Sequence, residues 1–138
     1  MSTSLSPYIG FRDNAREAME FYHSIFGGEL VSSTFADFHA SEDPADQDLL
    51  MHSQLTTPSG LILMASDTPS SMTFEEGARI TVALFGDDDG ELGGYWDGLA
   101  VGGSVQEPLV ESPWGDRFGM LTDRFGVHWM VNILGASA

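Results

Sequence analysis

The four histidines are the side chains with the clearest capacity for chemistry, because the sequence contains no cysteine. An unperturbed imidazole has a pKa of about 6.5 and can accept or donate a proton near neutral pH. We expect His23, in a predicted helix, and His39, in an acidic loop, to be solvated surface residues. His52 and His128 fall in predicted strands, where each can be a wall residue of a cavity or a proton-transfer group. His128 is the best candidate for a catalytic base.

The missing thiol also restricts metal chemistry. Without cysteine there are no disulfides, no thiolate catalysis and no sulfur-ligated zinc, so any metal ion has to be held by nitrogen and oxygen ligands. The acidic run at 87–90 (Asp-Asp-Asp-Gly) lacks the alternating ligands and the distal glutamate of an EF-hand loop. We interpret this run as a loop and helix cap rather than as a calcium site.

A second group of residues with chemical potential surrounds Trp114. Its indole offers a flat aromatic face, and the guanidinium of Arg117 offers a donor fork for an anion at the mouth of a cavity. The alternative is that Asp116 and Arg117 only pair with each other across a turn. The sequence leaves both interpretations open.

Length and charge set the frame for these residues. The chain has 138 residues, 42% of them hydrophobic, which suits one domain over residues 1–138. Its 21 acidic residues outnumber five arginines, and the net charge of −16 disfavours nucleic-acid binding. This acidity can serve solubility or concentrate a cationic ligand. No apolar run reaches the roughly 18 to 20 residues that span a bilayer, so we expect a cytoplasmic protein without membrane contact.

The first half of the chain predicts the order β-α-β-β-β. A short strand at 7–11 is followed by helical spacing of apolar residues at 15–26, with a capping-box-like start at Asn14 and Glu17. Gly27-Gly28 supplies the stop, because glycine accepts the left-handed conformation past a helix end. The remaining strands are expected at 30–38, 49–56 and 61–66, the last two joined by a turn at 57–60.

The second half repeats this order. It predicts strands at 80–85, 104–110, 118–122 and 127–133, with a helix at 91–101 after the first of them. The two copies are offset by about 74 residues and cover about 5–67 and 78–134. Two internal glycines, Gly93 and Gly94, weaken the second helix by about 1 kcal/mol each relative to alanine.

A four-stranded sheet covered by one helix leaves its other face uncovered. Two such units can form a partly closed, barrel-like cleft with the helices outside and alternate strand residues pointing inward. We therefore predict an α+β fold of two tandem βαβββ units with an apolar cleft, which is the usual kind of ligand site in a small domain.

Several segments carry a resemblance to a known family. They are Pro7-Tyr8-Ile9-Gly10-Phe11, Asn14-Ala15-Arg16-Glu17-Ala18, Phe21-Tyr22 with Phe26-Gly27-Gly28, Met51-His52, and the closing segments 114–119 and 123–129. Together they resemble PhnB-like proteins of the glyoxalase, bleomycin-resistance and dioxygenase superfamily, also called the vicinal oxygen chelate superfamily. The resemblance covers nearly the whole chain and implies the βαβββ fold.

The resemblance does not settle the function, because the superfamily includes isomerases, dioxygenases and antibiotic-sequestering proteins. PhnB-like sequences are often described as methyltransferase-like. This sequence has no glycine-rich strand-turn-helix motif that would cradle a nucleoside cofactor, so we do not carry that description over.

Metal-dependent members of the superfamily hold a divalent ion with four side chains, usually histidine or glutamate. The resemblance puts these positions near Pro7, at Met64 or Ser66, near Thr81 and at Met130. None of these residues is a good ligand, so no metal site and no cofactor are predicted. The alternative is a divalent metal held by an unorthodox set, His52, Asp67 and His128.

We predict a metal-free protein that binds a small organic molecule, hydrophobic or cationic, and works as a homodimer, as many members of the superfamily do. The alternatives are an enzyme, either a metal-dependent lyase, isomerase or dioxygenase or one with His128 as base, and a non-catalytic interaction domain. Whether the chain is an enzyme stays open. The residues expected to line the cleft are Pro7, Ile9, His52, Met64, Thr81, Trp114, Arg117, Phe118, Met120, His128 and Met130.

Overall fold

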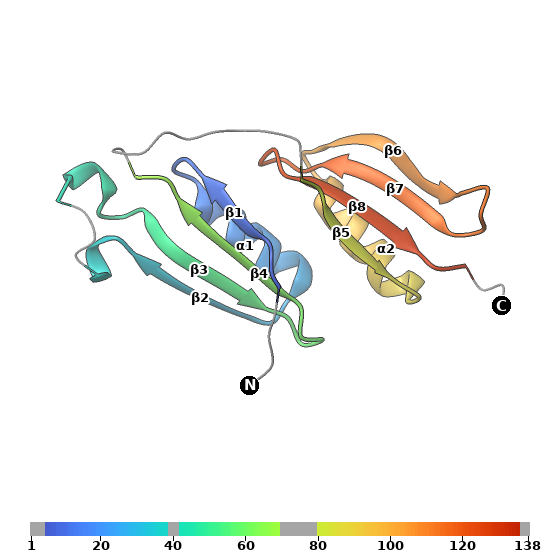
Figure 1. Cartoon of the computed structure of the whole chain (residues 1–138), viewed down its shortest axis with the longest axis horizontal. Helices are drawn as coiled ribbons and strands as arrows, with labels where there is room; N and C mark the ends of the chain where they lie inside the picture. The colour runs from blue at the N-terminus through green and yellow to red at the C-terminus, as the bar shows by residue number, and fades with distance from the viewer. Residues whose placement is uncertain (1–4, 39–41, 70–79, 136–138) are drawn as a thin grey trace. The chain divides into compact units, whose positions relative to one another are not determined.

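The chain divides into two units, Met1–Glu76 and Gly77–Ala138, which we call the N-unit and the C-unit. The computed structural model describes residues 5–38, 42–69 and 80–135. The described strands form two four-stranded sheets, one in each unit, rather than one closed barrel (Figure 1). The predicted α+β class with two βαβββ units is confirmed. None of the described helices is long and apolar enough to cross a membrane.

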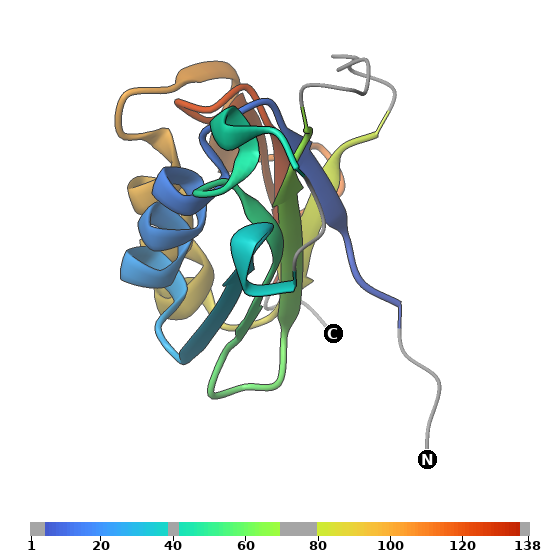
Figure 2. The same cartoon turned by 90° about the vertical axis from the view of Figure 1, so that its left-hand side faces the viewer.

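The N-unit has one helix on one face of its sheet. Its elements are β1 (Tyr8–Phe11), α1 (Ala15–Phe26), β2 (Glu29–Thr34), β3 (Leu50–Thr56) and β4 (Ile62–Asp67), with short 3₁₀ helices at Ala36–Phe38 and Pro44–Asp46. The strand order is β1-β4-β3-β2, with β1 parallel to β4 and the other pairs antiparallel. In Figure 2, α1 lies to the left of this sheet, and among the described residues of the N-unit no α-helix lies on the opposite face.

Helix α1 confirms the apolar spacing that predicted it. It buries Ala15, Ala18, Met19, Tyr22 and Phe26 against the sheet. The stop is also confirmed, since Gly27 has a φ of 70°.

The predicted capping box is wrong, because the side chain of Asn14 makes no cap hydrogen bond. The buried carboxylate of Asp67, at the end of β4, takes its place. One oxygen accepts a hydrogen bond from the Ala15 backbone N–H at 2.8 Å, and the other accepts from Leu50 at 2.9 Å. A negative charge at a helix N-terminus is favourable, so Asp67 ties α1 to two strands.

The strand predicted at 30–38 is too long, because β2 ends at Thr34. Asp37 and Thr34 form a reciprocal pair in which each side chain accepts a hydrogen bond from the other residue's backbone N–H. These bonds turn the chain into a 3₁₀ helix and lower the pKa of the Asp37 carboxyl, the backbone bond at Thr34 contributing most. A local side-chain contact therefore replaces the sheet.

The C-unit repeats this plan. Its elements are β5 (Val82–Gly86), α2 (Asp89–Ala100), β6 (Ser104–Glu111), β7 (Arg117–Thr122) and β8 (His128–Ile133), in the order β5-β8-β7-β6. Asp88 caps α2 by accepting a hydrogen bond from the backbone N–H of Glu91 at 3.0 Å, which confirms the acidic run as a cap. The buried residues of α2 are Leu92, Trp96 and Leu99.

Candidate functional site

Strand alternation gives each sheet a helix-covered face and an opposite face, which we call the open face. On β4, Leu63, Ala65 and Asp67 are buried, whereas the alternate residues Met64 and Ser66 are only half-buried. On β8, Trp129, Val131 and Ile133 are buried. The alternate residues on β8 are His128, Met130 and Asn132, which therefore share the open face of the C-unit.

The open face of the N-unit carries a tyrosine–histidine pair. Tyr8 is in register with Met64, so both side chains lie on this face. The Tyr8 hydroxyl lies 3.2 Å from Nδ1 of His52, within hydrogen-bond distance, and the two ring centroids are 5.8 Å apart. The next strand contributes Gln54, in register with Met64, and the edge strand contributes Val31. This face is therefore a polar pair beside an apolar centre.

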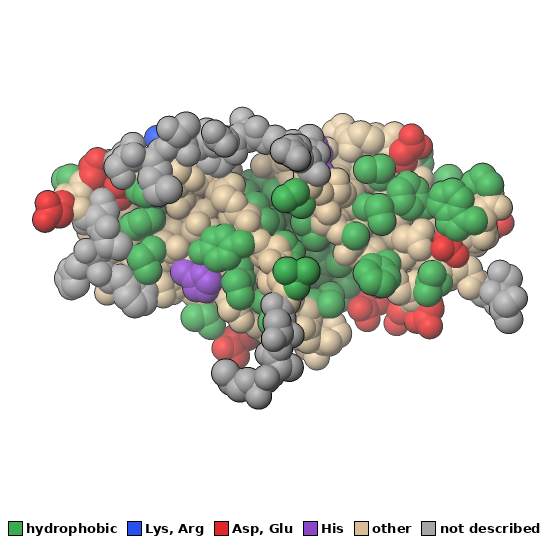
Figure 3. Space-filling view, in the orientation of Figure 1, with side chains coloured by type: hydrophobic (Ala, Val, Ile, Leu, Met, Phe, Trp, Pro, Cys, Tyr) green, Lys and Arg blue, Asp and Glu red, His purple; other side chains and the backbone are tan. Residues whose placement is uncertain are grey.

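The open face of the C-unit is more apolar. Three cross-strand pairs of β7 and β8 follow one another along it, His128 with Thr122, Met130 with Met120, and Asn132 with Phe118. Beyond them, the Trp114 indole meets the Phe118 ring edge-on at a centroid distance of 6.0 Å. Figure 3 shows hydrophobic side chains gathered over this sheet, with acidic side chains at its margin.

His128 is part of a hydrogen-bonded chain. Its Nδ1 lies 2.9 Å from the hydroxyl oxygen of Thr122. The Thr122 hydroxyl donates to Oε1 of Gln106 at 3.2 Å, and Nε2 of Gln106 donates to the carbonyl oxygen of Ser104 at 3.1 Å. Sequence reasoning did not single out Thr122 or Gln106, although the alternation on β7 places Thr122 on the same face as Met120 and Phe118.

The segment after β6 differs from both of its predicted arrangements. Arg117 forms an ion pair with Asp89, at the start of α2, and not with Asp116. Arg117 is in register with the buried Ile133, so it lies on the helix-covered side and does not belong to the open face. The ion pair is half-exposed, so it contributes little stability.

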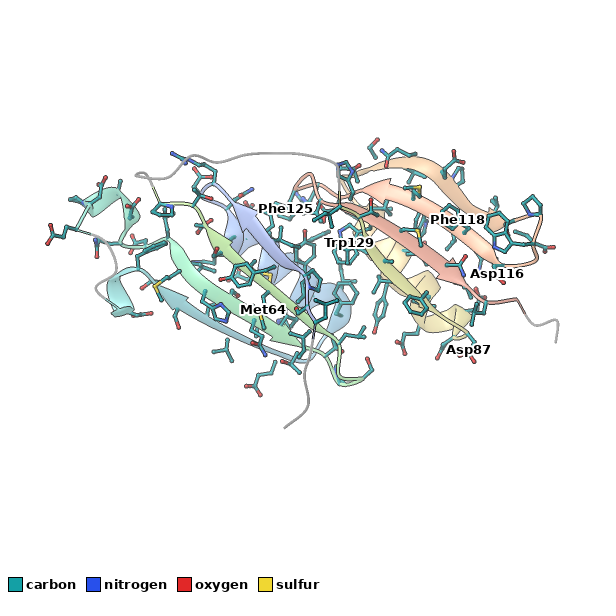
Figure 4. All side chains as sticks on the ribbon, in the orientation of Figure 1. Met64, Asp87, Asp116, Phe118, Phe125 and Trp129 are labelled. Atoms are coloured by element: carbon teal, nitrogen blue, oxygen red, sulfur yellow. The ribbon has the colours of Figure 1, made fainter. Side chains whose placement is uncertain are left out.

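Asp116 instead organises the end of β8. Its carboxylate accepts hydrogen bonds from Nδ2 of Asn132 at 3.0 Å and from the backbone N–H of Gly135 at 2.8 Å. These two bonds, the Asn132 bond first, lower the pKa of Asp116. Figure 4 labels Asp116 and Phe118, which stand at the same end of the C-unit sheet.

The remaining predicted residues fall in several places. Ile9 is in register with the buried Ala65, so its assignment to the open face is wrong; in a four-residue strand a one-residue slip exchanges the faces. Pro7 precedes β1, and its carbonyl oxygen accepts a hydrogen bond from the Met64 backbone at 3.1 Å. Thr81 precedes β5 by one residue.

The two histidines predicted to be solvated surface residues are His23 and His39. His23 is exposed, with Nε2 3.0 Å from the Gly28 carbonyl oxygen, and His39 lies outside the described residues.

The chain matches a known protein family over nearly its whole length. The sequence profile of the 3-demethylubiquinone-9 3-methyltransferase family matches residues 3–132, which is nearly the whole chain. The chain belongs to this family. It is 41% identical to the structure of PA1353 from Pseudomonas aeruginosa, with a TM-score of 0.81 and coverage of 97% of this chain and 99% of that one.

Two further structures have the same fold as this chain. A PhnB protein from Bacillus cereus, described as a putative 3-demethylubiquinone-9 3-methyltransferase, is 25% identical with a TM-score of 0.77, covering 96% of this chain and 100% of that one. A glyoxylase/bleomycin resistance protein/dioxygenase domain from Frankia is 16% identical with a TM-score of 0.63, covering 100% and 96%, and shares the fold. The resemblance to PhnB-like proteins is therefore confirmed, and the chain has the fold of the glyoxalase, bleomycin-resistance and dioxygenase domain.

The superfamily's usual divalent metal does not fit the residues of this PhnB-like chain. Met64 and Met130 stand at the open centres of their sheets, where the resemblance puts metal ligands (Figure 4 labels Met64). A thioether is a soft, neutral ligand, whereas Mg²⁺ and Mn²⁺ prefer carboxylate and other oxygen ligands. The part of the chain that the structure describes holds no group of three or more His, Asp or Glu side chains arranged for a metal ion.

The unorthodox metal set fails on geometry. Asp67 lies on the helix-covered face, 5% exposed, with both carboxylate oxygens accepting backbone hydrogen bonds. His52 lies on the open face of the same sheet, beside Tyr8. The two side chains are therefore on opposite sides of one sheet and cannot share an ion.

Proposed function

We propose that this PhnB-like protein binds a small organic molecule, hydrophobic or cationic, on the open faces of its sheets, without the usual divalent metal. In this proposal it acts in the cytoplasm as a homodimer. The reaction chemistry of the metal-dependent superfamily members is not part of the proposal, because the residues that would supply it are replaced.

The observation that carries the proposal is the pair of methionines at the expected metal-ligand positions. Met64 and Met130 are half-buried rather than exposed, and the cross-strand neighbour is Gln54 for Met64 and Met120 for Met130. Methionine side chains are flexible and polarisable, and they adapt to varied apolar and aromatic ligands. A site of this composition supports binding by shape and dispersion rather than by ion coordination.

The charge of the chain supports a neutral or cationic ligand. At a net charge of −16 the protein repels anions at long range and raises the local concentration of cations. Arg117, the residue predicted to receive an anion, is engaged with Asp89 on the other side of its sheet. We therefore expect an anionic substrate to bind weakly.

The first experiment is a metal assay of protein purified without an affinity metal column. We expect no stoichiometric metal, and thermal melting that is unchanged by a chelator or by added Mn²⁺, Ni²⁺, Zn²⁺ or Fe²⁺. A bound metal, or a melting temperature that falls with the chelator and recovers with one ion, would contradict the proposal.

The second experiment tests binding. Thermal melting against a panel of hydrophobic and cationic aromatic compounds should give at least one saturable stabilisation, and Met130→Gln should weaken it. Val101→Gln is the matched control, because Val101 is 59% exposed at the end of α2, away from the open face. A ligand effect that both substitutions reduce equally would place binding elsewhere.

An enzyme remains the second candidate, because Nδ1 of His128 is hydrogen-bonded and this leaves its other nitrogen for a substrate proton. Turnover of a bound compound that His128→Gln abolishes, without loss of binding, would favour it.

A non-catalytic interaction domain is the third candidate, supported by exposed hydrophobic residues such as Phe85, which is 74% exposed. Absence of saturable binding by every compound of the panel would favour that function.

A further inference from the structure

The chain of hydrogen bonds at the His128 end of the C-unit determines where each proton lies. The Ser104 carbonyl oxygen can only accept, so the amide nitrogen of Gln106, and not its oxygen, faces Ser104. The atom of Gln106 that faces Thr122 is therefore Oε1, which can also only accept. The orientation of this amide is fixed by its two neighbours.

The proton on His128 follows from this orientation. The Thr122 hydroxyl has one hydrogen, and it is donated to Gln106. Toward His128 the same oxygen can then only accept, so Nδ1 of the neutral imidazole must be the protonated nitrogen. Nε2 is left with its lone pair, and no hydrogen bond to Nε2 is found within the described residues.

Asn132, at the other end of the same face, is oriented in a similar way. Its amide nitrogen donates to the carboxylate of Asp116 at 3.0 Å, so the carbonyl oxygen Oδ1 is directed elsewhere. Asn132 and His128 are four residues apart on β8, which is about 13 Å at the usual rise of a strand. Met130 lies between them, paired with Met120.

We infer that the open face of the C-unit selects a ligand with an aromatic or apolar body and a hydroxyl or N–H donor, with Nε2 of His128 as the acceptor. The body rests on Met120 and Met130, where thioethers meet an aromatic ring favourably. Thr122 and Gln106 are positioning residues that act through His128. This inference names the ligand class of the proposed function and rests on it, but the tautomer of His128 is independent of any ligand.

The tautomer is tested first, on the unliganded full chain. Two-bond correlations from the ring protons to ¹⁵N identify which imidazole nitrogen carries the proton, at a pH where the ring is neutral. We expect Nδ1–H in the wild type and a shift toward Nε2–H in Thr122→Val and Gln106→Met. Thr56→Val is the control, since Thr56 is in register with Ile62 in the N-unit and should leave His128 unchanged. An Nε2–H tautomer in the wild type would overturn the inference.

Ligand class is tested with phenol, anisole and benzoate, followed by amide chemical shifts. Phenol should shift residues of β7 and β8 and bind about fivefold more tightly than anisole, which lacks the donor. Benzoate should be the weakest. Thr122→Val should remove most of the preference for phenol and keep anisole binding.

The two failures are distinguishable. If none of the three probes shifts β7 or β8 while the Nδ1–H tautomer is found, the proposed binding function fails and the assignment of His128 stands. If phenol and anisole bind equally well, or benzoate binds best, the inferred ligand class is wrong and a binding function remains.

Discussion

The N-unit and the C-unit have equivalent backbone hydrogen bonds beside the start of their helices, but different residues cap the two helices. In the N-unit Thr68 donates to the Phe11 carbonyl, and in the C-unit Leu134 donates to that of Gly86, so Asp67 and Ile133 occupy equivalent positions. Asp67 holds α1 from a distant strand, whereas Ile133 is apolar and α2 is capped by its own Asp88. The two units therefore share the backbone arrangement at the helix N-terminus, but not the residue that caps the helix.

The open faces differ in the same manner. The register places Met64 and Met130 at equivalent centres. Around these centres the N-unit has its polar pair, Tyr8 and His52, where the C-unit has Ala83 and Phe118. The C-unit has His128 where the N-unit has Ile62. Each open face therefore has a methionine at its centre, but the histidine stands at opposite ends of the two faces.

Exchanging the residues at the equivalent helix ends gives the largest expected effect. Ile133→Asp buries a carboxylate where the helix already has its cap, and should lower the free energy of unfolding by about 4 kcal/mol. Asp67→Ile leaves two buried backbone N–H groups without an acceptor and should cost about 3 kcal/mol. Urea denaturation measures both changes.

Tryptophan fluorescence reports the unfolding of the C-unit, because all three tryptophans belong to it. They are Trp96, Trp114 and Trp129. Their fluorescence should report the loss in Ile133→Asp directly. If Asp67→Ile is as stable as the wild type, the carboxylate is not what holds α1, and the contrast between the two units is lost.

The glycines after the two helices give the next effect. A Cβ on Gly28 would lie 2.1 Å from the Thr56 carbonyl oxygen, at a φ of +92°, and one on Gly103 would lie 2.5 Å from that of Thr122. Both contacts are with backbone and cannot relax easily. We expect Gly28→Ala to cost about 3 kcal/mol and Gly103→Ala about 2 kcal/mol, because only Gly28 adds left-handed strain to the clash.

Gly27→Ala is the control for backbone strain alone. Its φ is +70°, and a Cβ there would meet nothing within 4 Å. It should cost about 1 kcal/mol in the same urea experiment. Equal losses at Gly27 and Gly28 would mean that the close approach to β3 contributes nothing.

The turns between the last two strands of each unit come third. Thr57 to Leu61 and Asp123 to Val127 have the same backbone hydrogen bonds, but only Asp123 also accepts from the indole Nε1 of Trp129, at 2.9 Å. Asp123→Thr imports the residue of the N-unit and should cost about 2 kcal/mol, since the buried indole N–H loses its acceptor. In a Trp129→Phe background the same substitution should cost less, and an unchanged cost would show that the indole bond is unimportant.

Much of this architecture is predictable from the sequence, because it is local. The apolar spacing of α1, the stop at Gly27 and the turn at 57–60 each depend on neighbouring residues. The residues that could not be predicted meet across long separations: Asp67 reaches Ala15 over 52 residues, and Arg117 reaches Asp89 over 28. No local pattern distinguishes these carboxylates from the other acidic residues of the chain.

The candidate site shows the same division. The alternation on β8 predicts that His128 and Met130 share a face, since a six-residue strand between fixed neighbours leaves little freedom. The four residues of β1 do not fix their own register, so Tyr8 and Ile9 exchange faces. Thr122 and Gln106 act on His128 through the direction of their hydrogen bonds. That direction can be assigned only when the acceptor of each bond is known, which the sequence does not give.

The smallest expected effect tests why the second helix is the poorer one. Gly94 is exposed within α2, and a Cβ there would meet nothing within 4 Å. Gly94→Ala should therefore raise the free energy of unfolding by about 0.5 to 1 kcal/mol, because alanine loses less conformational entropy in a helix. Tryptophan fluorescence in urea is the measurement, and Glu20→Ala, at the matching exposed position of α1, should change little. If Gly94→Ala lowers the free energy of unfolding instead, we infer that another molecule in solution contacts the outer face of α2 at Gly94, where a side chain would obstruct that contact.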